Sequence, residues 1–241
     1  MESYQTGSGY SCLNTARSAS SSFLQLDNGL TIGTHPLIRR FLKGVFVLRP
    51  ALPRYNATWD VNIVLKYLKS LSPLSSLSLL QLSQKLLMLL AILSGQRGQT
   101  FHMIDIRNIY ISEDSVKFVI GDLLKTSSPK SHLAEMNFVS YKSDMDLCIV
   151  HTISTYLQQT DQLRGSVTRL FITTQKPHRP VSRDTIGRWL KIVMQQSGID
   201  VNIFKPHSTR AVSLSAARGL RIPIDTTCIS RTVGWSKDSG N

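Results

Sequence analysis

One segment, residues 77–94, constrains the fold of this chain more than any other. It carries leucine at positions 77, 79, 80, 82, 86, 87, 89, 90 and 93. These positions cover nearly every side of a helix, and a helix that is apolar all round lies inside a core. Gly95 follows directly and suits the conformation that ends many helices. The sequence therefore predicts a buried core helix with Arg97 just beyond its C-terminal end.

Two short polar clusters carry the chemistry of the sequence. The first is Gly95–Thr100, which contains Arg97, and the second is His207–Arg210, followed downstream by Trp235. Arginine suits an anionic phosphodiester, because it stays charged and offers a planar fork of donors. His207 and Arg210 are three residues apart and so share one helical face. We expect Arg97, Arg210 and His207 to meet at one phosphate, to which the Trp235 indole N–H can also donate.

A lysine in the loop after the predicted hairpin is the candidate general acid for a leaving oxygen. Lys125 and Lys130 both lie there, and spacing alone does not separate them. Taken singly, each of these features has a plainer explanation: a His-x-x-Arg pair is usually surface polarity, and a loop lysine is usually a solvated charge. Only their order along the chain and their occurrence together indicate a site.

The charge of the chain favours a polyanionic partner. Lys and Arg number 28 against 15 Asp and Glu, which gives a formal net charge of +13 and a pI near 10.0. The simplest such partner is nucleic acid, although a basic protein without that ligand is the alternative. The basic residues are spread along the chain with no run of five like charges. The basic stripes lack interleaved aromatic residues, which argues against stacking on single strands.

Several other classes of protein fit the sequence poorly. The three cysteines are far apart with no Cys-x-x-Cys pair, and the histidines show no metal-ligand spacing, so we expect neither a disulfide framework nor a metal site. The N-terminus lacks the pattern of a secretory signal. The longest apolar run, Leu86–Leu93, is far below the about 20 residues that span a bilayer. We therefore expect a soluble intracellular chain that does not contact a membrane.

The pattern along the chain predicts a mostly helical protein with a few strands. Proline residues in the segment 49–55 mark a boundary between residues 1–55 and 56–241. Strands are expected in a hairpin over 108–120, at 136–141 and, as a short extended piece, at 170–173. Helices are expected at about 13–24, 35–48, 59–68, 77–94, 147–160, 182–197 (capped by Ser182 and ended by Gly198), 207–218 and 225–233.

Two of these helices have a polar stripe opposite their apolar side. Arg39, Arg40 and Lys43 form that stripe in the helix at 35–48. In the helix at 182–197 the stripe consists of Arg188, Lys191 and Gln195. Both stripes are candidate DNA-binding surfaces, and for the stripe in the helix at 182–197 an ordinary solvated face is the alternative.

As a set, these motifs resemble the catalytic domain of the tyrosine recombinase (phage integrase) superfamily. The resemblance is carried by the buried helix ending in Ser-Gly-Gln-Arg97, the hairpin with Lys-Thr beyond it, Pro-His207-Ser-Thr-Arg210 and Gly-Trp235-Ser. It is greatest to the eukaryotic mobile-element branch, the Crypton and DIRS-like recombinases, which the segment 34–46 and its following linker also resemble. The likeness covers roughly residues 10–237.

The resemblance implies an α+β fold. Residues 56–241 would form a mostly helical catalytic domain with a small three-stranded antiparallel sheet, truncated before the tyrosine. Residues 1–55 would form a partial all-helical core-binding domain with its linker. It further implies that the protein binds double-stranded DNA, in the nucleus, as a homo-oligomer on its site.

The family's chemistry implies a role for each site residue. A tyrosine attacks the phosphate to give a 3′-phosphotyrosyl bond, with no metal or other cofactor. Arg97 and Arg210 would clamp the phosphate, Lys125 would act as general acid, and His207 would assist proton transfer. Trp235 would help to hold the phosphate, and the helix at 182–197 would lie against DNA.

The sequence departs from the family at one position. The family's tyrosine follows the Gly-Trp pair by some ten residues, and no tyrosine follows Trp235 here. We therefore expect a chain that binds DNA but does not cleave it alone. It would be a clipped recombinase, a non-catalytic DNA-binding remnant of a mobile element, or a pocket supplied with a tyrosine by a neighbouring protomer. An RNA-binding or structural protein is the alternative outside the family.

Overall fold

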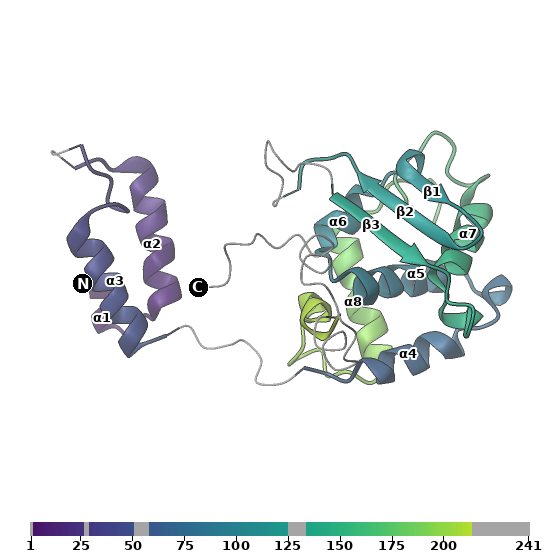
Figure 1. Cartoon of the computed structure of the whole chain (residues 1–241), viewed down its shortest axis with the longest axis horizontal. Coiled ribbons are helices and arrows are strands. Elements are labelled where there is room, and N and C mark those ends of the chain that lie inside the picture. Colours follow the sequence, from purple (N-terminus) through teal and green to yellow (C-terminus); the bar gives the residue numbers. More distant parts are fainter. Residues whose placement is uncertain (1, 27–28, 51–57, 125–133, 214–241) are drawn as a thin grey trace. The chain divides into compact units, whose positions relative to one another are not determined.

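The computed structural model describes residues 2–26, 29–50, 58–124 and 134–213. The chain divides into two compact units, Met1–Asn56 (unit 1) and Ala57–Asn241 (unit 2). Within the described residues, unit 1 is helical, while unit 2 combines helices with one small sheet (Figure 1). No helix among these residues has the length and apolarity needed to cross a bilayer.

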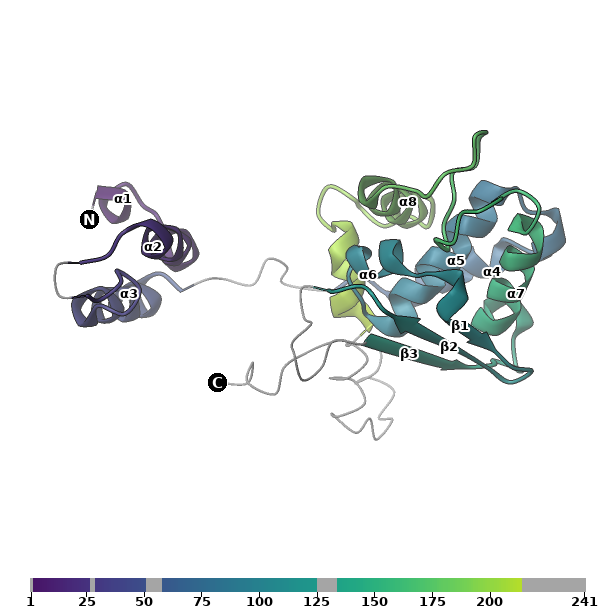
Figure 2. The same ribbon diagram turned by 90° about the horizontal axis from the view of Figure 1, so that it is seen from above.

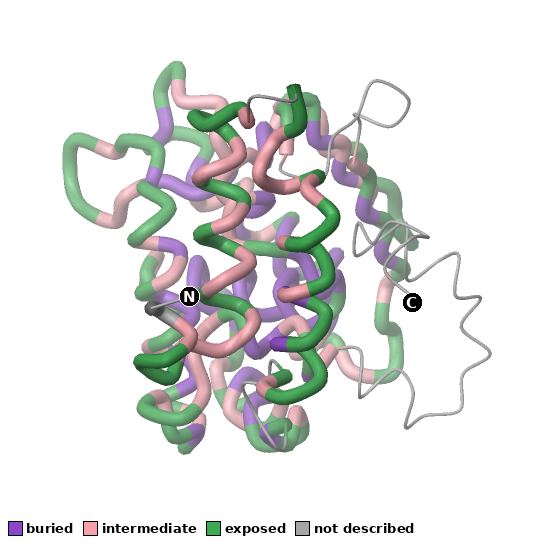
Figure 3. Tube along the Cα trace, turned by 90° about the vertical axis from the view of Figure 1, so that its left-hand side faces the viewer, coloured by how far each residue is buried: buried purple, intermediate pink, exposed green. Residues whose placement is uncertain are grey.

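Unit 1 consists of α1 (Glu2–Gln5), α2 (Tyr10–Phe23) and α3 (Pro36–Leu48). Proline opens α3, where its missing N–H costs no hydrogen bond. Arg49 follows α3, donates from Nη1 to the carbonyl of Tyr4 over 2.7 Å and lies over the Tyr4 ring. Only Leu42 and Val45 of α3 are buried, and α2 has no buried residue (Figure 3). Unit 1 therefore has a small core.

Unit 2 is built around α5 (Leu79–Ser94), as the leucine pattern predicts. Ser78 and Gln81 form a reciprocal capping box at its start, and Gly95 ends it with φ +59°. The burial goes further than the pattern suggests, because the polar Ser83, Gln84 and Lys85 are buried as well. Lys85 Nζ donates to the carbonyl of Leu71 over 2.6 Å, which satisfies one of its donors inside the core.

Three further helices of unit 2 pack around this centre. They are α4 (Val61–Ser70), α7 (Ile149–Thr160) and α8 (Arg183–Gln196). Both α7 and α8 contact α5, and α4 contacts α8. The hydroxyl of Ser182 accepts from the N–H of Thr185, which confirms the predicted cap of α8. Figure 2 shows α5 between α8 and the sheet, so α5 separates the two layers.

The sheet contains β1 (Ile109–Ile111), β2 (Ser115–Ile120) and β3 (Ala134–Val139), in that order and antiparallel. The alternating residues Val116, Phe118 and Ile120 turn inward, and Phe118 meets Phe138 edge to face. The predicted hairpin is confirmed. The third strand begins and ends two residues earlier than predicted, because Ala134 pairs with Ile120 in the observed register. The α+β fold class is confirmed.

The sequence gives no prediction of α6 (Gly98–Met103), which follows Arg97. It is short, begins with glycine and offers too few residues to show a periodicity. Short 3₁₀ helices occur at Leu74–Ser76, Ile106–Asn108, Met145–Leu147 and Pro206–Ser208. The last opens the helix expected from His207, and residues 209–213 continue it as α-helix. The remainder of that helix and the one predicted at 225–233 lie outside the described residues.

Candidate functional site

The end of α5 holds Arg97 at the surface while its neighbour turns inward. The backbone N–H of Gln96 donates to Ser94 Oγ over 3.2 Å, and the Thr100 hydroxyl donates to Gln96 Oε1 over 3.2 Å. Gln96 and Thr100 are buried, whereas Arg97 is exposed as the residue that caps α6. The sharp turn at Gly95 therefore delivers a guanidinium group to the surface from a rigid, internally bonded loop.

The second cluster is anchored from the start of unit 2. The indole N–H of Trp59 donates to Ser208 Oγ over 2.9 Å, and both residues are buried. Thr209, also buried, donates from its hydroxyl to the carbonyl of Pro206 over 2.8 Å. Between and beyond these inward side chains, His207 is exposed and Arg210 is half-buried. The turn therefore has two residues fixed in the core and two presented to a pocket.

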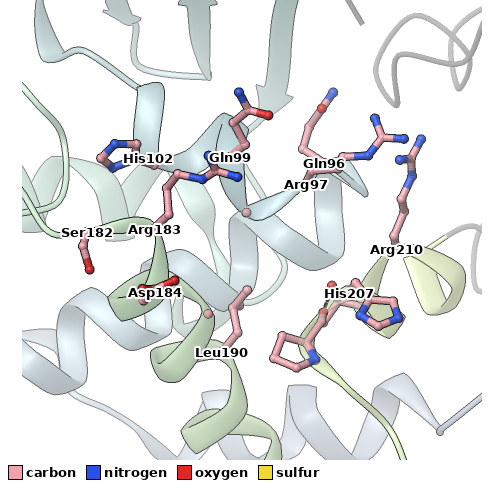
Figure 4. Close-up of a pocket in the computed structure, with 14 residues that line it drawn as sticks. Gln96, Arg97, Gln99, His102, Ser182, Arg183, Asp184, Leu190, His207 and Arg210 are labelled. Carbon is pink, nitrogen blue, oxygen red and sulfur yellow. Dashed lines mark hydrogen bonds between the residues drawn. The ribbon is translucent and has the colours of Figure 1, made fainter. Parts of the chain in front are cut away.

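One cavity of about 940 Å³ receives residues from both clusters. Its lining comes from three segments: residues 96–102, residues 182–190 of α8 with its cap, and residues 206–210. Arg97, His207 and Arg210 all belong to this lining, as their predicted meeting at one phosphate requires. Figure 4 shows the guanidinium groups of Arg97 and Arg210 side by side. We call Arg97, His207 and Arg210 the candidate phosphate clamp.

The two arginines of the clamp influence each other electrostatically. Burial lowers the pKa of Arg210 from its ordinary value, and the neighbouring positive charge of Arg97 lowers it further. Arginine nonetheless stays protonated in proteins. Two like charges held this close repel, so an anion bound between them gains more than it would from either alone. The geometry is therefore suited to a phosphate, carboxylate or similar group.

Two further side chains that the sequence did not indicate also line the cavity, Arg183 and His102. Arg183 is the first residue of α8, and His102 lies in α6. The ring of His102 is held by a 3.0 Å hydrogen bond between Nδ1 and the carbonyl of Val181. Among the described residues, Asp184 is the only acidic one in the lining. The position of Arg183 directly after the predicted cap Ser182 is a signal that could have drawn attention to it.

The two predicted DNA-binding stripes are exposed, but neither lines the cavity. Arg188, Lys191 and Gln195 lie on the open side of α8, where Arg188 makes a long 3.4 Å hydrogen bond to the Thr185 hydroxyl. In unit 1 the side chains of α3 that make up the other stripe are also exposed; they are Arg39, Arg40 and Lys43. Both stripes are therefore accessible to a partner, and their part in DNA binding stays a prediction.

Three site predictions fall outside the described residues: Lys125, its alternative Lys130, and Trp235. Their roles stay predictions. Across the described parts of the chain, histidine, cysteine, aspartate and glutamate form no group of three that could hold a metal ion.

Comparisons with known proteins show which solved structures have a similar fold. No protein-family model matches the chain, and no curated protein does. Among solved structures, it is similar to a XerH site-specific recombinase bound to palindromic difH substrate in a post-cleavage complex. That match has a TM-score of 0.59 and 11% identity, over 97% of this chain and 63% of the other. The chain shares the recombinase fold.

Two further solved structures have a similar fold. A pre-cleavage complex of XerH with its difH substrate matches with a TM-score of 0.55 and 10% identity, over 91% of this chain and 55% of the other. A XerA recombinase matches with a TM-score of 0.53 and 14% identity, over 96% of this chain and 78% of that one. The chain thus spans little more than half the length of the XerH chains, and identities this low establish the fold alone.

Proposed function

We propose that this chain is a DNA-binding protein of the tyrosine-recombinase type, and that its phosphate clamp grips one backbone phosphate of double-stranded DNA. A single observation carries this: Arg97 and Arg210, far apart in sequence, line one cavity closely enough for the charge of one to lower the pKa of the other. The recombinase fold and the net charge of +13 support the same conclusion.

The clamp suits a phosphate better than a smaller or neutral ligand. Each guanidinium group presents parallel N–H donors that match two phosphate oxygens, and His207 adds a further donor at the cavity wall. Hydrogen bonds to charged groups contribute about 1.5–3 kcal/mol each. A bound phosphate also relieves the repulsion between Arg97 and Arg210, so the gain from the pair exceeds a simple sum.

The wider function that we propose is DNA recombination or integration. In that chemistry a phosphodiester is cut and rejoined through a 3′-phosphotyrosine, with Lys125 as general acid, His207 assisting proton transfer and Trp235 holding the phosphate. The two similar XerH structures are a pre-cleavage and a post-cleavage complex with difH substrate, and this cleavage is an activity of XerH itself. We assign the nucleophile to none of the tyrosines in this sequence. A non-catalytic DNA-binding remnant of a mobile element would use the same clamp.

The remaining parts of the proposal concern how the protein assembles on DNA. Residues 1–55 would act as a partial core-binding domain and residues 56–241 as the catalytic domain, so that Arg39, Arg40 and Lys43 add contacts from unit 1. The protein would work in the nucleus, as a homo-oligomer on its site. Sedimentation of the chain with and without a DNA duplex tests the assembly, and imaging of the tagged protein tests the location.

Salt-dependent DNA binding tests the clamp. We expect Arg97→Ala and Arg210→Ala each to weaken binding to a DNA duplex by roughly tenfold or more, since each removes a charge-assisted hydrogen bond. Arg97→Ala should also reduce the slope of log K against log salt by about 0.9. Lys142→Ala is the matched control, because Lys142 is an exposed basic residue paired with Asp114 and does not line the cavity. Wild-type affinity and slope in both clamp variants would refute the proposal.

A further inference from the structure

The cavity is larger than the phosphate clamp requires. At about 940 Å³ it lies near the top of the ~300–1,000 Å³ range of ligand pockets. A single phosphate group leaves most of it unfilled. A longer stretch of DNA backbone would use it.

The unused part of the lining also contains an arginine. Arg183 at the first position of α8, with Gln99 and His102 of α6, lines the cavity without belonging to the clamp. Figure 4 shows the side chain of Arg183 extended toward Gln99. We call Arg183, Gln99 and His102 the second subsite. It presents a guanidinium fork and an amide, which donate hydrogen bonds to an anion, beside the imidazole of His102.

A hydrogen bond between α6 and the segment before α8 holds one side of the second subsite in place. The Nδ1 of His102 is hydrogen-bonded to the carbonyl of Val181, the buried residue before the cap of α8. A carbonyl oxygen only accepts, so Nδ1 carries the hydrogen and the ring is fixed between α6 and α8. The start of a fourteen-residue helix adds a positive partial charge beside Arg183. Asp184 favours that helix start and limits where a phosphate fits.

We propose that the second subsite binds a second phosphate of the same DNA strand, next to the phosphate that the clamp holds. This rests on the proposed function, because it requires DNA in the cavity. Arg97 and Arg183 then bind their phosphates independently, because they stand on different elements. The cavity holds a dinucleotide step of backbone, which sets the path of the strand across the start of α8.

The test is whether two substitutions have additive effects on the slope of log K against log salt. Binding is measured on a DNA duplex of random sequence. Four variants are compared with the wild type by fluorescence anisotropy over a range of salt: Arg97→Ala, Arg183→Ala, the double variant and Lys142→Ala. We expect each single cavity variant to reduce the slope by about 0.9 and the double variant to reduce it by about 1.8. A further variant, Arg183→Lys, keeps the charge and should retain the wild-type slope. Thermal melting confirms that each variant is folded.

Other outcomes would overturn the second subsite in distinct ways. A double variant with the slope of Arg97→Ala alone would mean that both arginines contact one phosphate. An Arg183→Ala variant with weaker binding only on some sequences, and an unchanged slope, would indicate a base contact. If Arg183→Ala matches the wild type while Arg97→Ala does not, the second subsite fails and the clamp stands. If neither variant differs, the proposed function fails first.

Discussion

At the scale of single residues, the position of the clamp depends on side chains outside it. Arg210 is half-buried and His207 exposed because the residues between them, Ser208 and Thr209, are fixed in the core. Ser208 receives its hydrogen bond from Trp59, which lies at the other end of unit 2 in sequence. The position of the arginine is thus set by an indole N–H that no local motif includes.

Trp59→Phe should therefore affect the clamp as well as stability. It keeps an aromatic ring but leaves the buried Ser208 hydroxyl without its donor, which costs about 1–3 kcal/mol of unfolding free energy. We expect DNA binding to weaken in the wild-type background but not further in an Arg210→Ala background. Urea unfolding and DNA titration of the four combinations measure both effects.

Trp189→Phe is the matched control for this cycle, since Trp189 is another buried tryptophan of unit 2. It should lower stability without coupling to Arg210. Equal and additive losses of DNA affinity for Trp59→Phe in both backgrounds would show that Trp59 acts only on overall stability.

At the scale of elements, a carboxylate joins the segment after α6 to the segment before α8. Asp105 accepts hydrogen bonds from the N–H and guanidinium of Arg107 and from the hydroxyl of Thr168. These bonds, with that of the Arg107 side chain as the largest cause, lower the pKa of Asp105 to about 2. The network holds the strand-bearing part of unit 2 against the segment that leads into α8.

This network predicts a pH dependence of stability. Because the folded state lowers the pKa of Asp105 from 3.8 to about 2, it favours the carboxylate. The resulting stabilisation is complete above pH 3.8 and is lost as the pH falls through about 2. Asp105→Asn should cost about 1–2 kcal/mol at pH 7, less than the full shift allows because Arg107 is largely exposed.

Urea unfolding of wild type and Asp105→Asn at pH 7 and pH 3 measures this. The difference between them should shrink at pH 3, where the unfolded carboxylate is mostly protonated. Asp161→Asn, at an exposed aspartate that ends α7, is the control and should change little at either pH. A difference for Asp105→Asn that is the same at both pH values would rule out the carboxylate as its source.

The open side of α8 carries another prediction of this scale. Arg188 and Lys191 are exposed on it, adjacent to the cavity-lining side of the same helix. If DNA lies along α8, replacing both by alanine should lower the salt slope by about 0.9 for each phosphate that these two side chains neutralise. Anisotropy titrations over a range of salt give that slope. An unchanged slope would assign the stripe to an ordinary solvated face.

At the scale of the whole molecule, the sequence was most informative where a pattern is local and long. The leucines of α5 cover a full helix, so burial followed from the pattern without any knowledge of neighbours. The alternation of β2 likewise predicted which side of the strand turns inward. By contrast, α6 is too short to show a period, and its existence depends on Thr100 and Phe101 being buried against other elements.

The sequence alone therefore predicted the core helix, the hairpin and the two clusters that contain Arg97 and Arg210. Each rests on residue type and spacing within one segment. The sequence predicted that Arg97 and Arg210 come together, whereas tertiary packing added two relations that it could not show: Trp59 holds the turn between His207 and Arg210, and Arg183 rather than Arg188 faces the pocket. These relations join residues distant in sequence, and the side of a helix that lines a cavity is set by the elements that pack against it.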